Sequence, residues 1–108
     1  MAREQEPGGL DLLVLRLLSE REMYGFEIIA ELAKRSQEVF QLKEGTLYPL
    51  LRRLENEGAV TSRAEKIDGR IRRYYRITKK GGARLEERQT EWNRYSAAVN
   101  AVLASALT

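Results

Sequence analysis

Residues 78–107 carry one helical pattern that is too long for a small protein to cover. Thr78 is a suitable N-cap, and apolar side chains then recur at intervals of three, four or seven residues. At about 1.5 Å per residue, such a helix is roughly 45 Å long, so its apolar side predicts a second subunit. The residues predicted at this dimer interface are Leu85, Trp92, Tyr95, Val99, Val102 and Ala106 of the long helix, with Leu12 and Leu15 near the N-terminus.

The sequence contains no cysteine and no histidine. Disulfides, thiol nucleophiles, zinc–thiolate clusters and histidine acid–base catalysis are thereby excluded. We therefore expect a protein without enzymatic activity, cofactor or metal. The longest apolar run, residues 12–15, is far shorter than the roughly 20 residues that span a bilayer, and the N-terminus lacks an apolar signal-peptide core. These features predict a cytoplasmic protein with no membrane partner.

Three helical patterns precede the long one. They cover residues 10–18, residues 24–34 and a segment from Lys43 or Glu44 to Glu57, which ends at the C′ glycine Gly58. Pro49 requires this third helix to begin near Gly45 or to bend. Its apolar stripe of Leu47, Leu50, Leu51 and Leu54 is expected to face the core. Residues 39–42 have the pattern of a short strand.

A basic hairpin is predicted between the third helix and the last. Residues 59–66 and 70–77 form its strands, and Asp68-Gly69 forms a type I′ turn. Along the second strand, Arg73 and Tyr75 share the inward face. Between Thr61 and Arg84, nine basic residues stand against two acidic ones, a net charge of +7, whereas the rest of the chain carries −4. Such a segment is typical of a surface that binds a polyanion.

The order of the elements predicts a mostly α fold with a small β-hairpin wing. Residues 1–77 would form a winged helix-turn-helix domain that binds DNA. Residues 78–108 would form a dimerisation helix that packs as one unit with the N-terminal helix. In such domains the third helix enters the major groove, and the wing reaches the flanking backbone or minor groove.

Several polar side chains are candidates for contact with double-stranded DNA. They are Lys43, Thr46, Tyr48, Arg52 and Arg53 from the third helix, and Lys66, Arg70, Arg72 and Arg73 from the wing. For Tyr48 and Arg52, packing on the protein surface is the alternative, and phosphate and base contacts are both open. Thr46 is also a possible helix cap, and Arg73 is also placed to pair within the protein. Tyr74 and Tyr75 fit wing packing better than base stacking.

Three segments resemble the PadR-type family of transcriptional regulators. Residues 44–58, EGTLYPLLRRLENEG, resemble the recognition-helix signature, residues 24–28 resemble the opening of helix two, and residues 69–81 resemble the wing and the entry to helix four. The resemblance implies a homodimeric repressor that binds an inverted repeat. It also implies an effector, either a phenolic acid or a planar hydrophobic drug. Trp92 matches the tryptophan that stacks on flat ligands in the family, and Asp11 and Leu15 would lie near it.

The resulting prediction is a homodimeric, sequence-specific DNA-binding repressor that a planar hydrophobic small molecule releases. Trp92 fits two roles, an anchor of the dimer core and a surface on which the ligand stacks. The alternative function is a winged-helix module that docks on an acidic protein partner without specific DNA binding. Salt dependence separates the two functions, because affinity for DNA falls steeply as salt rises.

Overall fold

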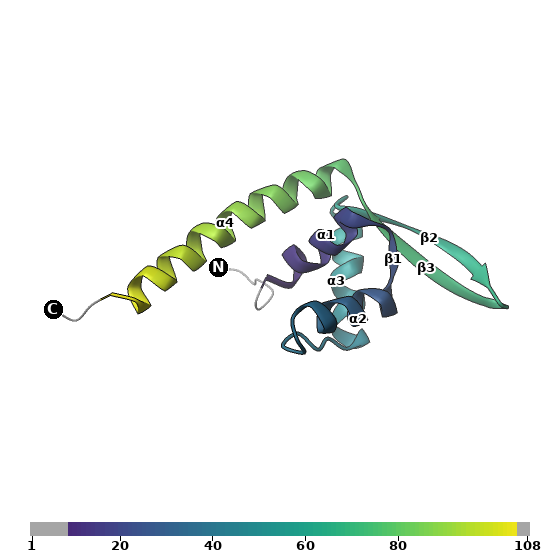
Figure 1. Ribbon diagram of the computed structural model, residues 1–108. Helices are drawn as coiled ribbons and strands as arrows, with labels where there is room; N and C mark the ends of the chain where they lie inside the picture. Colours follow the sequence, from purple (N-terminus) through teal and green to yellow (C-terminus); the bar gives the residue numbers. More distant parts are fainter. Residues whose placement is uncertain (1–8, 106–108) are drawn as a thin grey trace.

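The computed structural model describes residues 9–105, which form four helices and one antiparallel sheet (Figure 1). The helices are α1 (Leu10–Glu20), α2 (Gly25–Arg35), α3 (Glu44–Asn56) and α4 (Lys79–Leu103), and the strands are β1 (Met23–Tyr24), β2 (Val60–Ile67) and β3 (Arg70–Ile77). The order in the sheet is β1-β3-β2. The predicted fold, mostly α with a β-hairpin wing, is confirmed.

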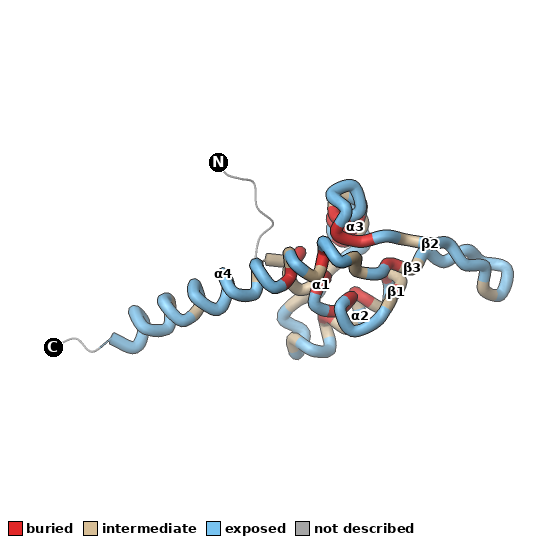
Figure 2. The backbone as a smooth tube through the Cα atoms, turned by 90° about the horizontal axis from the view of Figure 1, so that it is seen from above, coloured by how far each residue is buried: buried red, intermediate tan, exposed pale blue. Residues whose placement is uncertain are grey.

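The molecule has a central body from which two long elements leave in opposite directions. Helices α1, α2 and α3 form the body, the β2–β3 hairpin (the wing) extends from one side, and α4 extends from the other (Figure 1). The long dimension is therefore 66 Å, against 28 and 26 Å across. Burial follows this layout, since the buried residues lie in the body while the outer half of α4 and the wing tip are exposed (Figure 2).

The core forms where the three helices of the body meet the base of the sheet. The stripe predicted on α3 is buried as expected. The main contributors are Val14, Leu15, Leu17 and Leu18 of α1, Ile28 and Leu32 of α2, Leu47, Leu50, Leu51 and Leu54 of α3, and Val60, Tyr75 and Leu85. Two predicted interface residues are corrected by this packing. Leu15 is fully buried and Leu85 is 7% exposed, so both belong to the protomer's own core and neither is available to a partner.

Local signals predicted the hairpin turn, the glycine at the end of α3 and the cap of α4 correctly. Asp68 and Gly69 both have positive φ, 51° and 78°, as a type I′ turn requires. Gly58 has φ of 80° just after α3, where Ala59 N donates to Leu54 O at 2.8 Å. The hydroxyl of Thr78 accepts a hydrogen bond from Gly81 N at 3.0 Å and so caps α4.

The structure differs in places from the predicted elements. Residues 39–42 form no strand, because no other strand lies beside them; the third strand is instead β1, which pairs with β3 through Met23–Tyr75 and Tyr24–Tyr74. Helix α3 begins at Glu44, one of the expected starts, and contains Pro49. Helix α4 ends at Leu103, before the expected end near residue 107. Ala106, predicted at the dimer interface, lies outside the described residues.

Candidate nucleic-acid interface

The exposed side of α3 begins at an uncapped helix N-terminus. Lys43 is the N-cap, and its carbonyl accepts hydrogen bonds from Thr46 N and Leu47 N, both at 3.0 Å. No side chain caps this end, so the possible capping role of Thr46 is not realised. Free N–H groups at a helix N-terminus favour an anion. Lys43, Thr46 and Arg52 are exposed along this side, and Arg53 is half-buried.

Tyr48 packs against α2, which corrects its expected outward orientation. Its hydroxyl lies so close to the Cα of Gly25 that a Cβ at that position would overlap the Tyr48 ring and hydroxyl. Burial, and to a lesser extent the nearby Glu44 carboxylate, raise the pKa of Tyr48 above its ordinary value. The ring therefore holds the first turn of α2 against α3 as a neutral phenol. Surface packing, one of the two alternatives from the sequence, is what the geometry shows.

Two wing arginines make contacts within the protein, although both are exposed. Arg73 Nη1 donates to Ser62 Oγ at 3.0 Å, and Ser62 Oγ donates to Glu55 Oε2 of α3 at 2.8 Å. Arg73 thus pairs within the protein, as the sequence allowed. The guanidinium of Arg72 lies over the ring of Tyr24, 4.3 Å from its centroid. Stacking of this kind covers one face of the guanidinium and leaves its edges for hydrogen bonds.

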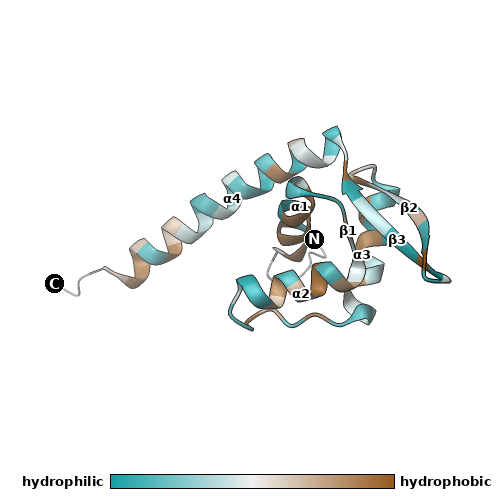
Figure 3. Ribbon diagram, turned by 45° about the vertical axis from the view of Figure 1, so that its right-hand side comes forward, coloured by the Kyte–Doolittle hydropathy of each residue, from teal (hydrophilic) through white to brown (hydrophobic). Residues whose placement is uncertain are grey.

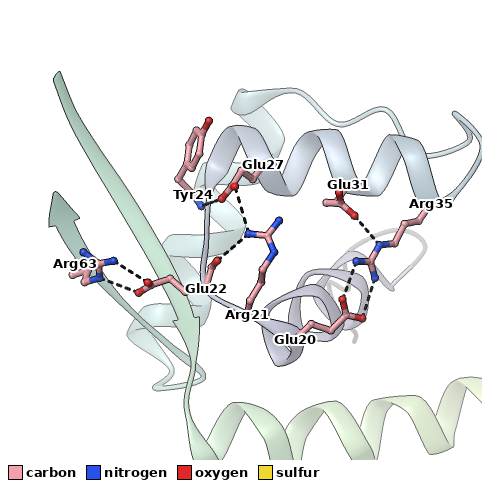
Figure 4. Close-up of polar contacts among 8 residues, drawn as sticks. All are labelled: Glu20, Arg21, Glu22, Tyr24, Glu27, Glu31, Arg35 and Arg63. Atoms are coloured by element: carbon pink, nitrogen blue, oxygen red, sulfur yellow. Dashed lines mark hydrogen bonds and ion pairs between the residues drawn. The ribbon is translucent and has the colours of Figure 1, made fainter. Parts of the chain in front are cut away.

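The base of the wing is joined to the segment between α1 and α2. Arg63 of β2 makes a bidentate ion pair with Glu22, with Nε–Oε2 at 2.9 Å and Nη2–Oε1 at 2.8 Å (Figure 4). Arg63 Nη1 also contacts Glu65 at 2.7 Å. The hydrogen bond from Arg63 lowers the pKa of the Glu22 carboxyl below its ordinary value. Both partners are therefore ionised at neutral pH.

Two further basic residues of the wing lie near its tip. Lys66 and Arg70 are exposed beside the turn. Ile71 is 73% exposed as well, because the wing extends beyond the body and only Tyr75 and Ile77 of that face reach the core. An exposed cationic hairpin and an uncapped helix N-terminus are both suited to contact with phosphates.

A pocket of about 480 Å³ lies beside Trp92, between α1, the segment before α3, and α4. Its lining is Leu12, Leu13, Arg16, Phe40, Gln89, Trp92 and Asn93. Neither Asp11 nor Leu15 lines it. Asp11 is 7% exposed and accepts a hydrogen bond from Arg88 Nη2 at 2.8 Å, so it joins α1 to α4. Trp92 is 49% exposed and lies 5.8 Å from Tyr95, centroid to centroid.

Sequence reasoning missed the residues that come together only through the fold. Phe40 reaches the pocket from the segment that resembled a strand, and Glu22 meets a wing arginine 41 positions later. No periodic or local signal marks either residue. Tyr24 was visible as part of the helix-two motif, but its contact with Arg72 depends on the pairing of β1 with β3.

Comparison with known proteins identifies the family. A sequence model described as the transcriptional regulator PadR-like family matches residues 14–87. The chain belongs to this PadR-like family. It is 43% identical over 86 residues to an uncharacterized protein of Lysinibacillus sphaericus, with 79% of each chain covered. It is 36% identical over 85 residues to a transcriptional regulator of Mycobacterium tuberculosis, with 79% of this chain and 77% of that protein covered.

Solved PadR structures share the fold of this PadR-like chain. A PadR family regulator from Eggerthella lenta aligns with a TM-score of 0.81 and 33% identity, covering 92% of this chain and 85% of that one. A PadR-like regulator from Bacillus cereus aligns with a TM-score of 0.79 and 34% identity, covering 92% and 95%. The resemblance stated from the three sequence motifs is thus confirmed.

This PadR-like protein is a DNA-binding transcriptional regulator and not an enzyme. Across residues 9–105, no helix is long and apolar enough to cross a membrane. In the same part of the chain, no group of three or more acidic side chains is placed to hold a metal ion.

Arg70→Ala is expected to weaken binding to any DNA sequence and to reduce its salt dependence. Each phosphate contact contributes about 0.9 to the slope of log affinity against log salt, so the slope should become shallower by about that amount. Fluorescence anisotropy of labelled duplexes over a salt series measures it. Arg35→Ala is the matched control, because Arg35 carries the same charge but is bound by Glu20 and Glu31 on the far side of the body (Figure 4). An unchanged slope in Arg70→Ala would remove this residue from the interface.

Proposed function

We propose that this PadR-like protein is a homodimeric repressor that binds an inverted repeat in cytoplasmic DNA. In this proposal residues 1–77 bind DNA and residues 78–108 join the two subunits. The observation that carries it is the exposed apolar side of α4. Tyr95, Val102 and Leu103 are 62%, 74% and 77% exposed on a helix that leaves the body. Apolar residues recur along this outer half (Figure 3).

A second copy of α4 is the partner that fits this surface. Helix α4 has 25 residues, and the domain covers only its first part. Trp92, Tyr95, Val99 and Val102 recur at three- and four-residue intervals, which is the spacing at which two helices pack against each other. A two-fold axis through this contact would pair the two α3 helices, and proteins of this kind bind half-sites about 34 Å, or one helical turn, apart.

The DNA contacts follow from the exposed cations and the start of α3. Lys43, Thr46, Arg52 and Arg53 would approach the major groove, and Lys66 and Arg70 the flanking phosphates. The edges of the stacked Arg72 guanidinium would add a phosphate contact. Tyr48 and Arg73 would support the DNA-contacting residues without touching DNA themselves, since each is occupied by contacts within the protein.

The pocket beside Trp92 supports release by a planar hydrophobic effector. Its walls include the side chains of Leu12, Phe40 and Trp92, and Arg16 and Gln89 add polar groups. Apolar walls with a few polar groups are the usual composition of a small-molecule site. The pocket adjoins the proposed contact between subunits, so a ligand bound there would change how the two α3 helices are spaced.

Selection of duplexes from a random-sequence library by the full chain tests the DNA-binding proposal. Enrichment of an inverted repeat with half-sites about one turn apart is the expected result. The selected operator then serves to screen planar aromatic compounds for release. Enrichment of a single half-site would contradict the dimer, and failure to enrich any sequence would favour the protein-interaction module instead.

Val102→Asp is expected to weaken dimerisation about 30-fold, because a charge would be buried at the proposed contact. Val102 is 74% exposed in the protomer, so the fold should persist. Sedimentation velocity over a dilution series measures the association. Asn100→Asp adds the same charge two positions earlier on α4, on the other side of the helix, and should leave association unchanged. Equal behaviour of the two variants would contradict the proposed interface.

A further inference from the structure

One of the side-chain contacts between the wing and the body joins Glu22 to Arg63. Glu22 lies in the short segment between α1 and β1, and Arg63 is the fourth residue of β2. The sheet order places β2 on the outside, with β3 between it and β1. The bidentate pair therefore reaches across the base of the sheet, and it ties the outer strand directly to the body (Figure 4).

A stack of side chains follows the same path. The guanidinium of Arg63 lies 4.9 Å from the ring centroid of Tyr74, and Tyr74 meets Tyr24 edge-on at 5.5 Å. The guanidinium of Arg72 lies over the ring of Tyr24, 4.3 Å from its centroid. The segment that holds Glu22 and Tyr24 thus contacts both strands of the wing. We call Glu22, Tyr24, Arg63, Arg72 and Tyr74 the wing clasp.

The wing is also joined to α3 by the contact between Ser62 and Glu55, and its outer part extends beyond both contacts. Residues 64–66 of β2 and 70–73 of β3 are all exposed. The turn lies five residues past Arg63, which at about 3.4 Å per residue is roughly 17 Å. A pivot of about 10° at the clasp would therefore move the tip by about 3 Å, far more than the few tenths of an ångström that a hydrogen bond tolerates.

On electrostatic grounds alone, the negative charge of Glu22 is unfavourable on a surface that binds DNA. Its carboxylate neutralises one wing arginine and repels phosphate, so its charge lowers affinity for any nucleic acid. Any favourable contribution of Glu22 to DNA recognition must therefore come from the geometry that it imposes on the wing. A bidentate arginine–carboxylate pair fixes both distance and orientation, which a contact with a single lysine does not.

We propose that Glu22 and Arg63 are positioning residues that set the angle between the wing and α3, and so determine how well the protein separates its operator from other DNA. The pair itself contacts no base in this proposal. It acts through the wing tip, which it holds in register with the groove that α3 enters. The inference rests on the proposed recognition of a specific operator.

Glu22→Gln tests it with two affinities that should move in different directions. Specific affinity is expected to fall about five- to tenfold, which lies within the range of coupling between residues of one network. Non-specific affinity should hold or rise, because a negative charge is lost. Glu65→Gln is the matched control, since it also removes a carboxylate from Arg63, at 2.7 Å, but within the same strand. It should leave the ratio of the two affinities unchanged.

Charge reversal separates positioning from a general loss of structure. The double variant Glu22→Arg with Arg63→Glu restores an ion pair of opposite direction at the same net charge. Recovery of at least half of the lost discrimination is expected. If Glu22→Gln strengthens specific and non-specific binding equally, or weakens both equally, the positioning role is overturned.

A measurement without DNA keeps this inference distinct from the proposed function. The chain contains no cysteine, so spin labels at Asp68→Cys and Lys34→Cys report one distance between the wing tip and α2. Labelled protein diluted into excess unlabelled chain avoids pairs of labels between subunits. Glu22→Gln should broaden this distance distribution, and Glu65→Gln should not. If the distance distribution of Glu22→Gln is as narrow as that of the wild type, the clasp is overturned even where operator binding is intact. If the distribution broadens but no operator is bound by the wild type, the result counts only against the proposed function.

Discussion

Gly81→Ala is expected to destabilise the protein by about 3 to 4 kcal/mol, near the upper end for overpacking substitutions. A Cβ at Gly81 would overlap the carbonyl oxygen of Ala59 and lie 2.8 Å from Cγ1 of Ile77. The oxygen belongs to the backbone and already accepts hydrogen bonds from Thr78 N and Thr78 Oγ1. It has no room to move without breaking the start of α4.

The next glycine provides the control for this substitution. A Cβ at Gly82 meets nothing within 4 Å, and the residue lies in the helix. Gly82→Ala is therefore expected to stabilise the protein by about 0.5 to 1 kcal/mol, through the better helix propensity of alanine. Thermal unfolding of both variants at one protein concentration measures the contrast, with Gly81→Ala lowering Tm by about 15 °C or more. Two variants with equal Tm would contradict the close approach of α4 to Ala59.

Asp11→Ala is expected to destabilise the protein by about 3 kcal/mol, because it leaves a partly buried arginine without its main partner. The Asp11 side chain is 10% exposed and that of Arg88 is 29% exposed, with 2.8 Å between Oδ1 and Nη2. Arg88 Nε is buried and has no hydrogen-bond partner among the described residues, so the guanidinium depends on this carboxylate. Urea unfolding at matched concentrations gives the free energy difference.

Glu91→Ala is the comparison for that experiment. Glu91 also faces Arg88, but at 3.6 Å and with its side chain 62% exposed. Exposed pairs of this kind contribute about 0 to 1 kcal/mol, so this variant should unfold close to the wild type. If the two variants lose equal stability, the contact between α1 and α4 does not depend on the Asp11–Arg88 pair.

Features that depend on neighbours in the sequence were predictable. The Asp68-Gly69 turn needs only two residues that accept positive φ, and the start of α4 needs only a hydroxyl at Thr78 three residues before Gly81 N. The buried stripe of α3 follows from helical periodicity. These local rules were sufficient for the fold, and the basic charge of the hairpin marked the surface that we propose binds DNA.

Features that depend on distant pairing were not predictable. Strand β1 has only two residues, and it is a strand because Met23 and Tyr24 meet Tyr75 and Tyr74. Residues 39–42 have a strand-like pattern but no strand to pair with. Tyr48 is turned toward α2 because glycine at position 25 leaves room for its ring. The periodicity of α3 alone cannot predict this contact with another helix.

The chain contains a single tryptophan, and the fold places it on α4, half-exposed beside the pocket and away from the wing. Fluorescence excited at the red edge of the absorption band of the native protein therefore comes from this one tryptophan. Its emission maximum and quenching report the surroundings of α4 with no background from a second indole. The proposed association and the proposed ligand binding can each be followed on the unlabelled chain. A signal that changes when DNA is added would show that the wing end of the molecule and α4 are coupled.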